Sequence, residues 1–139
     1  MALNPPVLVD TNAILALLDR RDPNHATARG VLPAALILPS LVLPEVDYLA
    51  TTRLGAATAR AFLKGVVRGD FQIVDNTPLD FARALEIQES YADLRLGLVD
   101  SSIMAIAERL GMRRIFTFDR RHFLAVRPQK GLEYFELLP

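Results

Sequence analysis

The short apolar run Val7-Leu8-Val9 constrains the fold more than any other stretch of this chain. It is bounded by Pro5-Pro6 on one side and by Asp10 on the other. A continuous apolar run of this length, rich in β-branched residues, is typical of a strand buried in a parallel sheet. Apolar residues at helical spacing follow Asp10, with Thr11 or Asn12 as the candidate N-cap. The chain is therefore predicted to begin with a strand that leads directly into a helix.

The same alternation continues to the end of the chain. Further short strands are expected at residues 36–38, 71–74 and 115–118, with a possible edge strand at 134–137. Helices are predicted between them, most clearly over 99–110, where apolar residues repeat at the spacing of one buried face. Strands alternating with helices indicate a three-layer α/β/α domain with a short, mostly parallel sheet of four to five strands. We expect residues 1–139 to form a single domain, because this length suits one hydrophobic core.

The composition excludes chemistry that depends on cysteine and indicates the cellular compartment of the protein. The chain has no cysteine, which excludes disulfides, thiolate catalysis and cysteine-ligated zinc, and fits a reducing compartment. No stretch approaches the roughly 20 apolar residues of a membrane span, and the N-terminus lacks the basic flank of a signal peptide. We therefore expect a cytoplasmic protein without membrane association. Sixteen basic residues balance sixteen acidic ones, which by itself argues against a strongly basic nucleic-acid binder.

Four acidic residues stand out by their positions relative to the predicted elements. Asp10 follows the first strand and Asp119 follows the fourth. Glu45 lies at the start of the helix after the second strand, and Asp100 lies in the first turn of the 99–110 helix. In open α/β sheets, ligands bind beyond the carboxyl ends of the strands, where the following helices begin. The four carboxylates are therefore expected to converge at that edge of the sheet.

Four carboxylates in one place would repel one another and raise their pKa values, unless a cation lay among them. Oxygen ligands favour Mg²⁺ or Mn²⁺ over zinc. Such a cation can lower the pKa of a bound water, orient a phosphate and stabilise a leaving oxygen, which is the chemistry of phosphodiester hydrolysis. The alternative for each acid alone is a helix cap or a partner of the helix dipole. Glu45 and Asp100 fit that alternative less well, because both are bordered by apolar residues.

Four short motifs occur in order along the chain: Val-Asp-Thr-Asn at 9–12, Pro-Glu at 44–45, Leu-Val-Asp-Ser-Ser-Ile at 98–103 and Thr-Phe-Asp-Arg-Arg-His-Phe at 117–123. With them, essentially the whole chain resembles PIN-domain ribonucleases, and most closely the VapC-like toxins of bacterial and archaeal toxin–antitoxin pairs. The resemblance implies a metal-dependent endoribonuclease that cleaves RNA phosphodiester bonds. It also implies a homodimer, and inhibition by a small VapB-like antitoxin that occupies the active-site groove.

The resemblance also implies roles for individual residues. The catalytic, metal-binding acids would be Asp10 and Asp100 as primary ligands of Mg²⁺ or Mn²⁺, with Glu45 and Asp119 completing the shell directly or through water. Three neighbours would support them: Thr11, Asn12 and Thr117. Asn12 could bind a carboxylate or a water on the metal, and Thr117 could orient a carboxylate.

Other polar residues near the motifs have less defined roles. Four arginines could contact RNA phosphates, with a solvated loop as the alternative: Arg20, Arg21, Arg120 and Arg121. Asp93 could cap its loop or support the site. We assign neither His25 nor His122 to catalysis, since neither has a companion serine or cysteine at a telling spacing. The sequence leaves the RNA target and the number of metal ions open.

Three other functions compete with the toxin ribonuclease. A haloacid-dehalogenase-like phosphatase also begins with an aspartate after its first strand, but usually carries a second one two residues later, where this chain has Asn12. A catalytically inactive interaction domain is disfavoured because all four acids are present. A housekeeping RNA-processing PIN nuclease is disfavoured by the compact length and by the lack of an appended RNA-binding domain.

Overall fold

The computed structural model describes residues 5–129 and 131–139. Within them, five strands form one parallel sheet in the spatial order β3-β2-β1-β4-β5. The strands are β1 (Val7–Val9), β2 (Leu36–Pro39), β3 (Gln72–Val74), β4 (Arg114–Phe116) and β5 (Glu136–Leu138). The prediction of a short parallel sheet is confirmed. The predicted edge strand at 134–137 begins at Glu136 instead, and it does lie at the edge, paired with β4.

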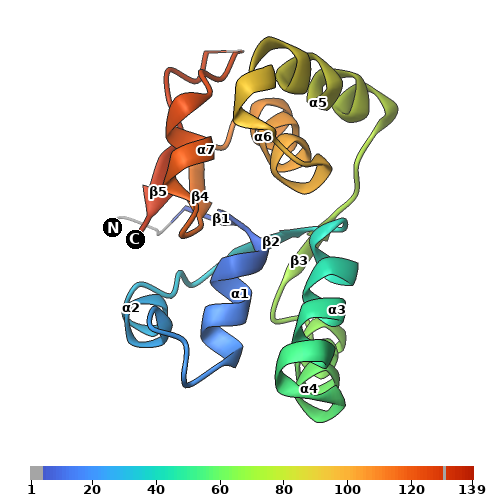
Figure 1. The fold of residues 1–139 in the computed structure, drawn as a ribbon, viewed down its shortest axis with the longest axis vertical. Helices are drawn as coiled ribbons and strands as arrows, with labels where there is room; N and C mark the ends of the chain where they lie inside the picture. Colours follow the sequence, from blue (N-terminus) through green and yellow to red (C-terminus); the bar gives the residue numbers. More distant parts are fainter. Residues whose placement is uncertain (1–4, 130) are drawn as a thin grey trace.

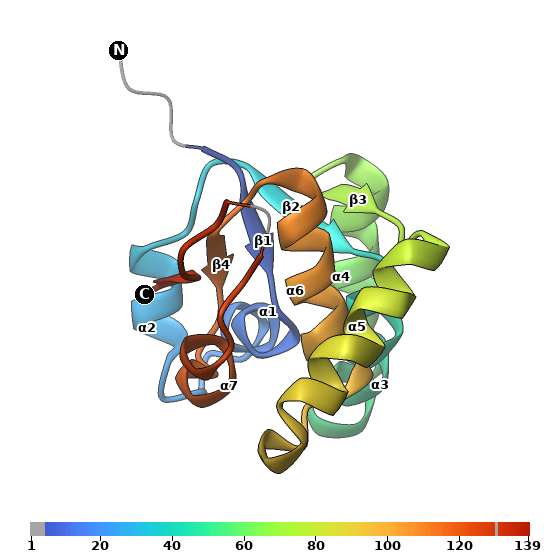
Figure 2. The ribbon, with the colours of Figure 1, turned by 90° about the horizontal axis from the view of Figure 1, so that it is seen from above.

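Helices connect the strands, and in the described residues they are α1 (Thr11–Leu18), α2 (His25–Gly30), α3 (Val42–Leu54), α4 (Ala56–Arg68), α5 (Pro78–Ser90), the 3₁₀ turn η1 (Ala92–Leu94), α6 (Leu98–Leu110) and α7 (Arg120–Ala125). Figure 1 shows α1, α2, α3 and α4 on one side of the sheet, and α5 and α6 on the other. In Figure 2, α6 lies nearer to β1 and β2 than α5 does. This arrangement is the predicted three-layer α/β/α architecture.

Local signals in the sequence explain where the helices begin and end. Thr77 caps α5 in a reciprocal capping box with Asp80. Gly111 ends α6 in the left-handed conformation, with φ of 66°, which glycine adopts without a steric penalty. At α1 the prediction of Thr11 or Asn12 as N-cap is wrong. The cap is Asp10, whose extended backbone and side-chain oxygen serve the first free N–H group of the helix.

The strand order places a topological switch point between β1 and β4. From β1 the chain moves outward on one side through β2 and β3, and it then returns to add β4 and β5 on the other side of β1. In open α/β sheets the crevice at such a point is where ligands bind, outside the carboxyl ends of the strands. Asp10 follows β1 directly and Asp119 lies three residues after β4, so both flank this crevice.

The core that fixes this crevice is continuous across the sheet. Leu8 of β1, Phe116 of β4 and Ile106 of α6 are fully buried and belong to one apolar cluster. Burial on both faces of the central strands makes their register, and hence the positions of their last residues, costly to change. In the described part of the chain, no helix has the length and apolar character required to cross a lipid bilayer.

Candidate metal centre

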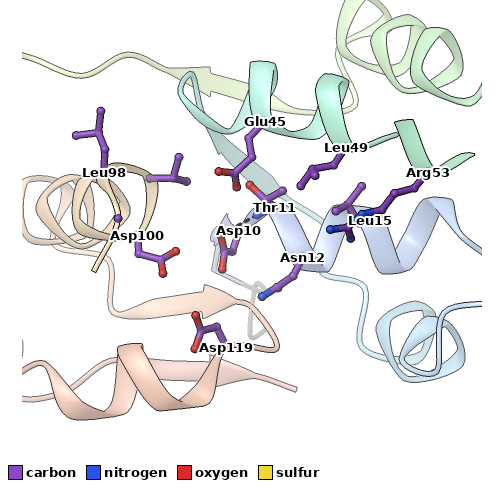
Figure 3. A pocket seen from close by; sticks show the side chains of 12 residues that line it. Asp10, Thr11, Asn12, Leu15, Glu45, Leu49, Arg53, Leu98, Asp100 and Asp119 are labelled. Atoms are coloured by element: carbon purple, nitrogen blue, oxygen red, sulfur yellow. Dashed lines mark hydrogen bonds between the residues drawn. The ribbon is translucent and has the colours of Figure 1, made fainter. Parts of the chain in front are cut away.

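A pocket of about 530 Å³ opens at the carboxyl edge of the sheet. It is bordered by the start of α1, one face of α3, the start of α6 and the turn after β4. All four predicted acids line it: Asp10, Glu45, Asp100 and Asp119. In Figure 3 their carboxylates point toward one shared space, although they come from four separate segments of the chain. The predicted convergence of these side chains is therefore present in the fold.

Asp10 is the most buried of the four acids, with only 3% of its surface exposed. One carboxylate oxygen accepts a hydrogen bond from the Thr11 backbone N–H at 2.8 Å. The other accepts one from the Thr117 hydroxyl, also at 2.8 Å. Burial, followed by the negative charge of Asp100, raises the pKa of Asp10 from 3.8 to about 7, while these two hydrogen bonds oppose the shift. The carboxylate is thus firmly held but unfavourable in its ionised form unless positive charge is nearby.

The pairing of β1 with β4 accounts for the contact between Thr117 and Asp10. Val9 lies opposite Phe116, so the residues that follow them also lie next to each other. The Thr117 hydroxyl also accepts a hydrogen bond from the Asp119 backbone N–H at 3.0 Å. Asn12 differs from its expected role. Its side-chain oxygen accepts from the Phe118 N–H at 3.0 Å and so secures the turn between β4 and α7, rather than binding a carboxylate.

His122 is a member of the acidic cluster that the sequence did not reveal. Its Nδ1 lies 3.0 Å from a carboxylate oxygen of Asp100 and 3.0 Å from one of Asp119. Asp119 is the N-cap of α7 and accepts a hydrogen bond from the His122 backbone N–H at 3.3 Å, which fixes the histidine one turn away. Single ligand atoms of these three residues lie within 4.8 Å of one another, a grouping that could hold a metal ion.

The pairing of buried acids elsewhere in the chain provides a comparison. Glu108 is fully buried and forms an ion pair with Arg83 at 2.8 Å. Asp80 is similarly buried and lies 3.0 Å from Arg109, which helps to hold its pKa below the usual value against the effect of burial. Among the described residues, by contrast, no arginine or lysine lies within ion-pair distance of the four pocket acids. A buried carboxylate needs a compensating charge, and a divalent cation would supply it here.

Two further observations fit a cation at this place. Burial raises the pKa of Asp100, an effect that the hydrogen bond from His122 opposes and the charges of Asp119 and Glu45 reinforce. The buried Thr11 hydroxyl also lines the pocket and has no hydrogen-bond partner among the described residues. The donors in the cluster are mainly carboxylate oxygens, which suit a hard divalent cation.

The remaining candidate residues lie less centrally. Arg20, Arg21, Arg120 and Arg121 do not belong to the pocket lining, whereas Arg53 of α3, which the sequence did not single out, does. Arg53 follows Glu45 and Leu49 at intervals of four residues, so the helical period could have identified it. Asp93 is exposed in η1 and does not line the pocket. His25 lies 2.7 Å from the carbonyl oxygen of Ala16 and joins α2 to α1.

The chain is similar to several known proteins. A family model described as PIN domain matches residues 7–127, a range that contains all four pocket acids. Ribonuclease VapC26 of Mycobacterium tuberculosis is 34% identical over 128 residues, which are 90% of this chain and 95% of that protein. In fold, the chain is similar to the crystal structure of Mycobacterium tuberculosis VapC20, described as a sarcin-ricin loop cleaving toxin. The TM-score is 0.77 at 22% identity, over 83% of this chain and 91% of the other. DNA-bound VapBC from Salmonella typhimurium gives a TM-score of 0.68 at 17% identity over 98% of both chains.

Proposed function

We propose that this chain, which belongs to the PIN-domain family, is a metal-dependent endoribonuclease and the toxin of a VapBC-type toxin–antitoxin pair. The observation that carries the proposal is the convergence of four acids in one pocket without arginine or lysine partners among the described residues. The same chain pairs its other buried acids with arginine, as at Glu108. The identity to a named VapC ribonuclease across nearly the whole chain supports the activity and the toxin assignment.

The pocket residues have two proposed roles, which are to bind the cation and to orient its ligands. Asp10 and Asp100 would hold a divalent cation as its primary ligands, and Glu45 and Asp119 would complete its shell directly or through water; all four line the pocket. The cation would supply charge that orients the scissile phosphate and makes water a better nucleophile. Thr117 and the first N–H group of α1 hold Asp10 in a fixed orientation, since each donates to a different carboxylate oxygen. A fixed carboxylate presents the same oxygen geometry in every turnover.

His122 acts as a positioning residue for two of these acids. Its Nδ1 lies between Asp100 at the start of α6 and Asp119 just before α7, so one N–H group can be shared by the two carboxylates. The nitrogen thereby sets the separation of two carboxylates that would otherwise repel each other. The oxygen-rich donor set favours Mg²⁺ or Mn²⁺ as the cation. Asn12 and Thr11 support the site from the α1 side, Asn12 through its bond to the Phe118 backbone.

The partners follow from the family assignment. We propose a small VapB-like antitoxin, which fits the resemblance in fold to VapBC complexes, and RNA as the substrate, encountered in the cytoplasm. We propose a homodimer through the α3–α4 region, because it exposes large side chains: Tyr48 is 67% exposed, Leu63 52% and Val67 82%. A Leu63→Glu variant should then run as a monomer in size-exclusion chromatography with light scattering. A variant that keeps the mass of the unaltered protein would place the interface elsewhere.

Inducible expression in a bacterial host tests the toxin assignment. The unaltered chain should arrest growth, and co-expression of a short reading frame encoded beside its gene should relieve the arrest. Asp10→Asn should be harmless at equal protein level, because it removes a primary ligand of the cation. Growth arrest that persists in this variant would show that metal-dependent cleavage is not the cause. Hydrolysis of small phosphomonoesters with RNA left intact would instead favour the phosphatase alternative.

A further inference from the structure

The pocket extends well beyond the acidic cluster. Leu15 of α1 and Leu49 of α3 form an apolar middle section, and Arg53 lies beyond them near the end of α3. Figure 3 shows this polarity directly, with the acids on one side of the view and Arg53 on the other, beside Leu15. A volume of about 530 Å³ is within the usual range for sites that hold a molecule larger than a single phosphate. The acids therefore account for only part of the pocket.

The period of α3 fixes the separation between the two ends. Glu45, Leu49 and Arg53 are spaced four residues apart, so they form one row along the helix and all three line the pocket. Eight residues of α-helix span about 12 Å. The Cα atoms of Glu45 and Arg53 are therefore about 12 Å apart, which places Arg53 beyond Leu15 and Leu49, where the next linkage of a bound strand would lie.

The guanidinium of Arg53 has no carboxylate within ion-pair distance among the described residues, whereas Arg83 and Arg109 are bound to buried acids. Within the fold its charge faces only the C-terminal end of the α3 dipole. A guanidinium presents a planar fork of donors that matches two phosphate oxygens. The apolar surface next to it offers packing for a sugar or a base face, and it provides no hydrogen-bonding groups that could identify a base.

We propose that Arg53 is a subsite for a phosphate of the RNA strand outside the scissile linkage. The subsite rests on the proposed ribonuclease function. An RNA strand whose scissile phosphate lies at the acids would continue along the pocket to Arg53. The pocket thus holds at least two linkages of a single strand: one at the acids, where cleavage occurs, and one at Arg53, which sets how the strand lies. Arg53 contributes affinity and register but no sequence preference.

The salt dependence of RNA binding tests this assignment. An Asp10→Asn parent is used so that the RNA stays intact, and binding of a labelled single-stranded RNA is followed by fluorescence anisotropy with Mg²⁺ at several salt concentrations. Each phosphate contact on a single strand contributes about 0.7 to the slope of log K against log salt. Arg53→Ala in this parent should lower the slope by about 0.7. Raising the salt from 50 to 200 mM should then weaken binding about 2.6-fold less than in the parent. Arg53→Lys should restore the slope.

Arg29→Ala provides the matched control. Arg29 is likewise an exposed arginine in the last turn of its helix, but it lies on α2 and does not line the pocket. It should leave the slope unchanged. An unchanged slope in Arg53→Ala, whether or not its melting temperature falls, would overturn the subsite and leave Arg53 as a partner of the α3 dipole. A parent that binds no RNA, together with an unaltered protein that cleaves none, would instead overturn the proposed function.

Discussion

Replacing Asp10 with asparagine should stabilise the metal-free protein above neutral pH, although it removes a residue central to the proposed activity. The pKa of Asp10 is raised from 3.8 to about 7, chiefly by burial and then by the charge of Asp100. Since one pKa unit corresponds to about 1.4 kcal/mol, keeping this carboxylate ionised in the fold costs roughly 4 kcal/mol. Asparagine has nearly the same shape and carries no charge, so this cost disappears.

The hydrogen bonds reduce the expected gain. Asparagine can still accept from the Thr11 N–H, but its amide NH2 must donate to the Thr117 hydroxyl, which in the unaltered protein donates to the Asp10 carboxylate. Exchanging this charge-assisted hydrogen bond for a neutral one of reversed direction costs about 1 kcal/mol, which leaves a net stabilisation of roughly 3 kcal/mol. In a chain of 139 residues this corresponds to a melting temperature about 10 °C higher. The measurement is thermal unfolding at pH 8 with EDTA, followed by circular dichroism.

The pH dependence has a defined sign. Between about pH 4 and pH 7 the folded protein retains a proton on Asp10 that the unfolded chain has lost. The contribution of this group to stability is therefore fully present below pH 4, and it is lost as the pH rises through about 7. The advantage of Asp10→Asn should shrink on acidification and nearly vanish at pH 4. Added Mg²⁺ should raise the melting temperature of the unaltered protein by more than that of the variant, which keeps three of the four pocket acids.

Asp80→Asn is the control with the opposite sign. Asp80 is as buried as Asp10, but Arg109 and the capping box with Thr77 hold its pKa below the usual value. Neutralising it leaves Arg109 without its partner, so this variant should be destabilised at pH 8. An Asp10→Asn variant that is equally or less stable than the unaltered protein at pH 8 in EDTA would refute the electrostatic account of the pocket.

Variants at four further positions distinguish the site from the rest of the fold. His122→Ala should weaken Mg²⁺ binding about 10- to 100-fold in titration calorimetry, because it releases two carboxylates from their common partner. His25→Ala should leave this affinity unchanged and only loosen α2; equal losses in both variants would exclude a positioning role. Thr117→Val should lower stability by about 1–3 kcal/mol in denaturant titration and reduce cleavage, and Thr117→Ser should restore both. Arg83→Met should destabilise the fold by about 3–5 kcal/mol, since it strands the buried charge of Glu108, while Mg²⁺ affinity in calorimetry stays unchanged.

The sequence could predict the features that depend on local pattern. Short β-branched runs and well-marked helix caps gave the alternation of strands and helices, because burial and capping act over a few residues. The position of acids at the ends of these elements then predicted the pocket, because the ends of parallel strands must share one edge. Asp10 illustrates a limit of this reasoning. The sequence presents its cap and pocket positions as alternatives, but the extended residue before a helix occupies both at once.

The missing features depend on packing between distant segments. His122 meets Asp100 only because α7 lies next to the start of α6, and 22 residues separate the two in the chain. Asn12 binds the Phe118 backbone across 106 residues, a contact that follows from the pairing of β1 with β4. Arg53 is a different case, since its spacing from Glu45 was visible in the sequence. The sequence does not show that this face of α3 lines a pocket, because that depends on Leu15 of α1 lying beside it.

Cation-dependent cleavage of RNA by the purified chain tests the central claim most directly. Equal amounts of the unaltered protein and of an Asp100→Asn variant with the same circular dichroism spectrum are incubated with single-stranded RNA, in Mg²⁺, in Mn²⁺ or in EDTA. We expect internal cleavage by the unaltered protein with either cation, none in EDTA, and none by the variant under any condition. Cleavage that persists in EDTA, or that survives the loss of the Asp100 charge, would contradict the assignment of this pocket as a metal-dependent ribonuclease site.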